Sequence, residues 1–250
     1  MRTTQLKVLL ASSALAASLA TLAAAQDVEA EIVSLEGYGY DELYADGMSV
    51  EELLDADVNG PTGEDIGEVE NVLFDQDGRV LSIIAEVGGF LEMGDTHVNV
   101  PWDQVQVAEG GDEVTIPVAQ DTVEDYTLVT DEVVTATDAS TEIEEVGGDN
   151  IGALNTGPAV WKATDLIGDT ARLRDGEADD LVGYGYVDDI VVRGEGIAAV
   201  VVSPGAGLGA PGYYALPYHG LTPGLGTYDL PYERTEVEAL EPFDEGLLDD

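Results

Sequence analysis

Residues 72–84 read VLFDQDGRVLSII, two apolar runs separated by the pair Asp77-Gly78. An Asp-Gly pair between β-branched and apolar residues predicts a hairpin, because glycine adopts the positive φ angle that tight hairpin turns require. Further apolar runs recur between turn signals, for example at 197–202. This pattern predicts many short strands and little helix, which is typical of a small barrel that leaves no sheet edge exposed.

The chain also repeats itself. Gly67 is followed 116 residues later by Gly183, and Pro101 is followed by Pro217 at the same spacing. Both segments combine a Gly-containing strand, an apolar strand, a glycine-rich turn and a Pro-aromatic segment. We interpret the repeat as two small units of the same kind in one chain.

The first unit carries a specific pattern over roughly 49–118. It combines an opening Leu-x-x-Ala-x-Val, a Gly-x-Val-x-Asn-Val strand, the Asp-Gly-Arg hairpin, a Gly-Gly-Phe turn and a Val-x-Val-Pro-Trp segment. The pattern is formed by Leu53, Ala56, Val58, Gly63, Ile66, Gly67, Val69, Asn71, Val72, Asp75, Asp77, Gly78, Arg79, Gly88, Gly89, Phe90, Val98, Val100, Pro101 and Trp102. It resembles the PRC-barrel family. The second unit resembles the family more loosely, because residues 193–196 read RGEG where the first unit has Asp-Gly.

The resemblance implies a compact six-stranded barrel that acts by contact with other macromolecules. The family module occurs in the photosynthetic reaction-centre H subunit and in a ribosome-maturation factor, and it shares no catalytic residues that could be carried over. We therefore expect an all-β protein with two small PRC-type β-barrels in tandem, short helices, an acidic linker and an irregular C-terminal tail.

The expected boundaries are a signal peptide at 1–25, an N-terminal extension at 26–48, a first barrel at 49–127, an acidic linker at 128–159, a second barrel at 160–220 and a tail rich in Gly, Pro, Tyr and acid at 221–250. The signal peptide is indicated by Arg2 and Lys7, an apolar stretch at 8–22 and three alanines before Gln26. We expect a periplasmic or secreted protein with no membrane span after cleavage. The alternative is an uncleaved anchor.

The charge balance limits the partners. The chain has 52 acidic and 8 basic residues, a net charge of −44, and no cysteine. Such a charge repels nucleic acids and anionic membranes, so we exclude both classes. Two explanations stay open: halophilic adaptation, in which salt screens the self-repulsion, or binding of weak divalent cations or a basic protein.

Three motifs resemble ligand sites but lack a required part. Residues 55–60 copy the first half of a calcium loop, yet Ile66 stands where the loop needs its bidentate carboxylate. Residues 205–210 imitate a dinucleotide fingerprint, but no helix can open at Pro211-Gly212. His97 and His219 are the only histidines, and we interpret both as ordinary strand-end or surface residues. The prediction is no catalytic, cofactor or metal site, and no enzyme.

The candidate partner-contact residues are apolar or aromatic and lie near one end of the two units, namely Phe90, Leu91, Met93, Trp102, Tyr213, Tyr214 and Tyr218. The alternative for these side chains is packing at the barrel ends or between the barrels. We predict an exported, non-enzymatic binding or scaffold protein that contacts another protein or an envelope complex. The other hypotheses are an acidic structural or cation-buffering envelope protein and an accessory protein like the reaction-centre H subunit.

Overall fold

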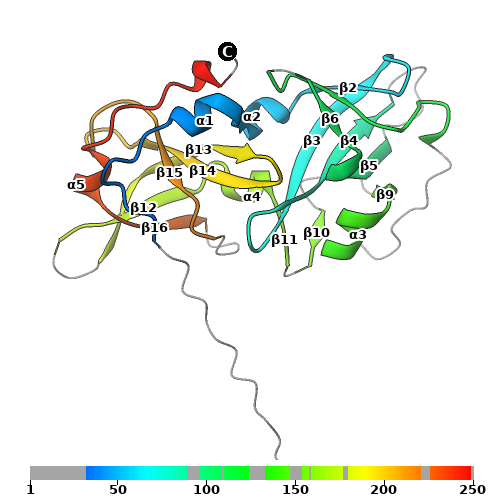
Figure 1. Cartoon of the computed structure of the whole chain (residues 1–250). Coiled ribbons are helices and arrows are strands. Elements are labelled where there is room, and N and C mark those ends of the chain that lie inside the picture. The colour runs from blue at the N-terminus through cyan, green and yellow to red at the C-terminus, as the bar shows by residue number, and fades with distance from the viewer. Residues whose placement is uncertain are drawn as a thin grey trace, which may run out of the picture. The chain divides into compact units, whose positions relative to one another are not determined.

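The computed structural model describes residues 32–88, 96–108, 110–123, 133–146, 154–157, 159–176, 180–220 and 226–248. Within them, two curled sheets with short helices make up the fold, and the expected mostly-β class is confirmed (Figure 1). No helix in these ranges has the length and apolar content that crossing a bilayer would need. The predicted signal peptide lies outside the described residues.

The first sheet has the order β6-β7-β2-β3-β4-β5-β9, and β11 pairs with β3 off this path. Its strands are β2 (Asp57–Asn59), β3 (Asp65–Asp75), β4 (Val80–Val87), β5 (Thr96–Pro101), β6 (Gln106–Val107), β7 (Glu113–Thr115), β9 (Glu144–Val146) and β11 (Val160–Lys162). The predicted hairpin joins β3 to β4, and Gly78 in its turn has the required positive φ of 81°.

The second sheet has the order β15-β14-β13-β12-β16, and β1 pairs with β13. Its strands are β1 (Met48–Ser49), β12 (Thr170–Arg174), β13 (Leu181–Arg193), β14 (Gly196–Pro204), β15 (Tyr214–Pro217) and β16 (Thr227–Glu233). A separate two-stranded sheet joins β8 (Val133–Val134) to β10 (Asn155–Thr156). The helices are α1 (Asp41–Asp46), α2 (Val50–Leu53), α3 (Ala136–Thr141), α4 (Ala163–Leu166) and α5 (Arg234–Val237), with 3₁₀ turns η1 (Trp102–Gln104) and η4 (Glu245–Leu247).

The two sheets exchange short strands. β1 precedes α2 and the first sheet in the chain, yet it pairs antiparallel with β13, with Ser49 opposite Val191. β11 precedes α4 and most of the second sheet, yet it pairs antiparallel with β3, with Lys162 opposite Leu73. The units are therefore interlocked, and the boundaries expected at 49 and 160 fall within or beside the exchanged strands.

The exchange brings α2 and α4 to the junction between the sheets (Figure 1). Ser49 caps α2, because its Oγ accepts a hydrogen bond from the Glu52 amide at 3.1 Å. The Glu51 amide donates to Asp189 of β13 at 2.7 Å. At α4, Asn71 of β3 donates from Nδ2 to the Thr164 hydroxyl at 2.8 Å. Each helix is thus hydrogen-bonded to the long strand of the other unit.

Asn71 and Asp189 occupy corresponding positions. Each lies just after a register shift of its long strand, between Val69 and Asn71 in β3 and between Val187 and Asp189 in β13. Both side chains are 1% exposed. A buried polar group must find a hydrogen-bond partner to offset its lost hydration, and here each finds one on the opposite unit's helix.

The two hairpin tips also meet. The Val80 amide donates to the Glu195 carbonyl and the Ile197 amide to the Gly78 carbonyl, both at 2.8 Å. The Tyr218 ring packs directly over Gly78, where no Cβ could be accommodated. These contacts join the β3–β4 hairpin to the β13–β14 hairpin.

A single apolar cluster spans both sheets. It contains Ile83 and Val100 from the first sheet, Ile190 and Val200 from the second, and Leu53 of α2, which is fully buried. Ile66, which stands where a calcium loop would need its bidentate carboxylate, also belongs to this cluster. Because apolar burial is the dominant favourable contribution to folding, a shared cluster couples the stabilities of the two units.

The segment from 221 differs from the irregular tail that its composition predicted. β16 pairs in parallel with β12 at the edge of the second sheet. Tyr228, Leu230 and Tyr232 alternate into the core, and each is at most 2% exposed. Pro231 falls where the pairing register shifts, a position that an edge strand tolerates because the missing N–H has no ladder partner there.

The segment expected to be an acidic linker also contributes to the first sheet. β9 pairs with β5, and α3 packs on β4 and β5 with Ala139 fully buried. α3 starts with a capping box formed by Thr135 and Asp138. The described part of the expected N-terminal extension likewise forms α1 and the start of β1, which lie against β13.

We expect Asp189→Asn to stabilise the protein at neutral pH. Burial raises the pKa of Asp189 from 3.8 to about 6. A raised pKa means that the folded chain binds the proton more tightly, so this stabilising contribution is complete below pH 3.8 and is lost as pH rises through about 6. Asparagine keeps the acceptor for the Glu51 amide and should raise the free energy of unfolding at pH 7 by about 1–3 kcal/mol.

Urea unfolding at several pH values checks this expectation. The variant should show a flatter stability profile than the wild type between pH 3.8 and 6. Asp57→Asn, at an exposed strand position, controls for the loss of one negative charge anywhere on the chain. An unaltered profile in the Asp189 variant would contradict the assignment.

We expect Leu53→Ala to destabilise both units together. Removing this fully buried side chain should cost about 2–5 kcal/mol. Because the core is shared, hydrogen exchange should accelerate equally at the amides of β3 and β13. Ile32→Ala, at a side chain that is 51% exposed, should change neither. Faster exchange in β3 alone would show that the units unfold independently.

Candidate functional site

The structure separates the seven candidate partner-contact residues. Phe90, Leu91 and Met93 lie outside the described residues. Tyr214 is 1% exposed and belongs to the core, so its side chain does not reach a partner surface. This corrects the docking interpretation for Tyr214, and the reason is that β15 turns this face inward.

Tyr218 is partly buried, and it packs against the β3–β4 turn, with its hydroxyl 3.5 Å from the Gln76 carbonyl oxygen. Tyr218 therefore packs between the two units, which is the alternative to partner contact that the sequence leaves open. Tyr213 is 40% exposed, and its carbonyl accepts a hydrogen bond from the Phe243 amide. Tyr213 therefore remains a surface candidate.

Trp102 lies in a pocket at the junction of the two hairpin tips. This pocket, which we call the seam pocket, has a volume of about 250 Å³ and is lined by Arg79, Val80, Leu81, Trp102, Asp103, Ser140 and Glu195. Trp102 opens η1 directly after Pro101 and is partly buried against the core. Arg79 stays largely exposed beside it, 3.4 Å from the Asp75 carboxylate.

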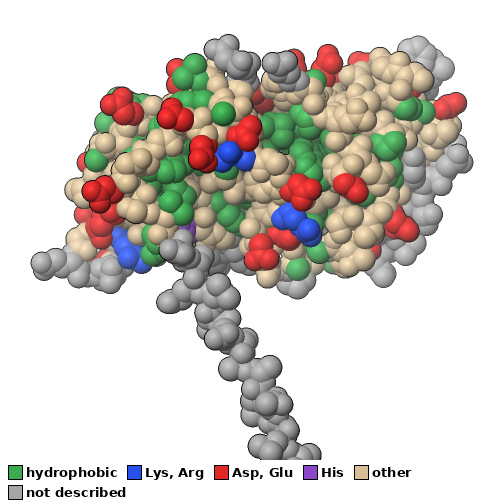
Figure 2. Space-filling view, in the orientation of Figure 1, with side chains coloured by type: hydrophobic (Ala, Val, Ile, Leu, Met, Phe, Trp, Pro, Cys, Tyr) green, Lys and Arg blue, Asp and Glu red, His purple; other side chains and the backbone are tan. Residues whose placement is uncertain are grey.

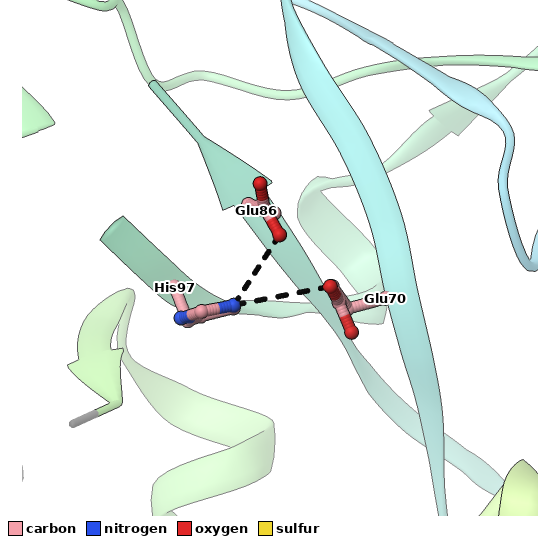
Figure 3. Close-up of side chains that lie close together, drawn as sticks. All are labelled: Glu70, Glu86 and His97. Atoms are coloured by element: carbon pink, nitrogen blue, oxygen red, sulfur yellow. Dashed lines mark ion pairs between the residues drawn. The ribbon is translucent and has the colours of Figure 1, made fainter. Parts of the chain in front are cut away.

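A second group of polar side chains gathers on the outer face of the first sheet. Glu70 of β3, Glu86 of β4 and His97 of β5 point toward one another (Figure 3). The His97 Nε2 atom lies 3.6 Å from a Glu86 carboxylate oxygen and 3.9 Å from a Glu70 carboxylate oxygen. One ligand atom of each residue lies within 4.8 Å of the other two.

The strand register explains how these three residues meet. Glu86 and His97 are directly opposite in the β4–β5 pair, so their side chains share a face. Glu70 lies on the same face because it alternates with Glu68, the residue directly opposite Glu86 in the β3–β4 pair. Since β3, β4 and β5 are consecutive in the sheet, the three side chains form a compact group.

The imidazole of this group is buried and the carboxylates are half-buried. The side chain of His97 is 8% exposed, against 30% for Glu70 and 26% for Glu86. Neither separation is short enough for a hydrogen bond, so the contacts are electrostatic. Nitrogen and carboxylate donors at such spacing are suited to a metal ion or to a charged imidazolium.

Sequence reasoning missed this group because it treated His97 as an ordinary strand-end residue. The Glu86–His97 pairing could have been found by aligning the two strands on either side of the Gly88-Gly89 turn. Glu70 could have been placed in the same way, because strand alternation puts it on the face of Glu68, which lies opposite Glu86.

His219 is different, because its partner is a tyrosine. Its Nε2 lies 2.5 Å from the Tyr232 hydroxyl, and the His219 amide donates to the Tyr228 hydroxyl at 3.2 Å. Burial lowers the pKa of His219, which favours the neutral imidazole. Among the described residues, His219 belongs to no group of side chains that could hold a metal ion.

Residues 45–141 match the family model of the PRC-barrel domain. Over this range the chain is similar to the PRC-barrel domain. The matched range holds β1 to β8 and α3, and the resemblance inferred from the sequence is confirmed there. The PRC-barrel domain is a non-enzymatic fold, and it suggests a binding or scaffold role.

The PRC-barrel domain includes both the seam pocket's Trp102 and the group formed by Glu70, Glu86 and His97. Apart from β1, the strands of the second sheet lie outside the matched range. Among curated proteins, none matches this chain.

Proposed function

We propose that this chain is an exported, non-enzymatic scaffold whose PRC-barrel domain binds a protein partner at the seam pocket. The observation that carries the proposal is the composition and place of this pocket. It joins a partly buried tryptophan, an exposed arginine and apolar residues at the point where the two hairpin tips are fixed to each other.

The pocket has the residue types that dominate binding energies at protein interfaces. Tryptophan and arginine are enriched at such energetic centres, because they bury a large area and make directed polar contacts. Trp102 is held by core packing, and the hairpin tips beside it are joined by backbone hydrogen bonds. A pre-formed pocket lowers the ordering cost of association.

The electrostatics favour a basic partner. The chain carries a net charge of −44, and acidic side chains outnumber basic ones on the face shown in Figure 2. Such a field accelerates the encounter with a positively charged protein and slows it with an acidic one. Export is supported by the signal-peptide pattern of residues 1–25 and places the partner in the periplasm or outside the cell.

Site-specific cross-linking tests this function. A photo-reactive phenylalanine analogue at Asp103, an exposed residue of the seam pocket, should capture one dominant protein in the native envelope. Trp102→Ala in the same background should abolish the capture. Arg79→Ala removes the directed contacts of a side chain that is 59% exposed, so it should weaken capture without affecting the fold.

The same analogue at Asp57, an exposed position outside the seam pocket, is the matched control. Identical products from positions 57 and 103 would refute docking at the seam pocket. Undiminished capture in both the Trp102 and Arg79 variants would do so as well, because it would place the contact elsewhere.

The acidic composition supports a second function, that of an acidic structural or cation-buffering protein. Self-repulsion in a chain of charge −44 is screened by salt, so the melting temperature should rise with NaCl concentration. Choline chloride at equal ionic strength separates screening from binding of small cations. A melting temperature that does not depend on either salt would remove this hypothesis.

A further inference from the structure

We propose that Glu70, Glu86 and His97 form a binding site for a divalent transition-metal ion, with Zn²⁺ as the best-fitting ion. The site is independent of the partner-binding function at the seam pocket. It lies on the outer face of β3, β4 and β5, where three consecutive strands each supply one side chain.

The donor spacing fits a metal ion of this size. Zn²⁺ binds imidazole nitrogen and carboxylate oxygen at bond lengths that place tetrahedral donors about 3.3–3.6 Å apart. The nitrogen–oxygen separations are 3.6 and 3.9 Å and all three donor atoms lie within 4.8 Å of one another, so small side-chain movements can bring them to one ion. The same separations exceed the range of an N–H···O hydrogen bond.

The buried imidazole is the independent indication that a ligand belongs here. His97 has a side chain only 8% exposed, and its Nε2 atom lies beyond hydrogen-bond distance of both carboxylates. Its Nε2 atom points between the two carboxylates (Figure 3). A buried polar group without a hydrogen bond loses its hydration without compensation, and a coordinated cation would supply the missing interaction.

The donor set also selects the class of metal. Imidazole is a ligand for Zn²⁺, Cu²⁺, Ni²⁺ and Fe²⁺, whereas Ca²⁺ and Mg²⁺ favour sites made of oxygen atoms alone. One nitrogen with two carboxylates therefore disfavours the alkaline-earth ions that a highly acidic surface attracts weakly. Three protein donors leave one tetrahedral position for water.

The consequence of binding is mechanical. An ion held by one side chain from each of β3, β4 and β5 cross-links three strands of the PRC-barrel domain. The chain has no cysteine and so has no disulfide to provide such a link. Because a metal bound only by the folded state stabilises that state, Zn²⁺ should raise the melting temperature.

The chain offers a direct spectroscopic test, because it has only two histidines. Imidazole ¹⁵N NMR should show the His97 nitrogens shifting on addition of one equivalent of Zn²⁺, while those of His219 stay in place. Calorimetry in about 0.3 M NaCl, which suppresses weak binding to the acidic surface, should give one site per chain. Millimolar Mg²⁺ or Ca²⁺ should not displace the ion.

Substitutions then assign the ligands. His97→Gln should abolish the Zn²⁺-dependent rise in melting temperature, and Glu70→Gln or Glu86→Gln should each weaken Zn²⁺ binding at least about tenfold. Glu68→Gln, at an exposed position two residues before Glu70 on β3, and His219→Gln are the matched controls and should bind as the wild type does. Melting temperatures without metal show that each variant folds.

Three results would overturn the site. One is unchanged Zn²⁺ affinity in the His97 variant. Another is an equal loss of affinity in the Glu68 control, which would indicate diffuse attraction to acidic residues. The third is an imidazole spectrum in which the His97 signals do not move when Zn²⁺ is added.

Discussion

The architecture depends on the exchange of two short strands. β1 and β11 are only two and three residues long, yet each fills the open edge of the long strand in the other unit. The exchange brings α2 and α4 to the junction, where they contribute apolar side chains to a common core. Without the exchange, β3 and β13 would expose unpaired backbone N–H and C=O groups, and such open strand edges promote aggregation.

One pair of residues shows how the two units have come to differ. Asn71 and Asp189 stand at matching bulges and both face a helix of the opposite unit. The amide is neutral and costs little to bury beside the Thr164 hydroxyl, whereas the carboxyl must either hold a proton or keep a charge in a poorly hydrated place. The second unit therefore carries a pH-sensitive position that the first lacks.

The sequence predicts those features that short-range chemistry determines. Asp77-Gly78 specifies the hairpin, Ser49 caps its helix and Ile66 packs in the core, because each depends on neighbouring residues or on burial periodicity. The strand exchange could not be predicted, since strands of two or three residues have no periodicity and their partners lie more than 80 residues away. β16 was missed because the Gly, Pro, Tyr and acid content of 221–250 indicated an irregular tail, although Tyr228, Leu230 and Tyr232 keep the alternation of a strand. The candidate metal group was missed because it depends on the register of three paired strands, which the residue pattern of each strand alone does not give.

The interlocked strands also govern the order in which a nascent chain can mature. A ribosome delivers β3 long before Val160–Lys162, so the edge of β3 at residues 73–75 has no partner until then. β1 waits longer still, since its partners Val191 and Val192 are synthesised about 140 residues after it. The amino-terminal half consequently cannot complete its native pairing until Val191 and Val192 have been synthesised, so its maturation waits for most of the second unit.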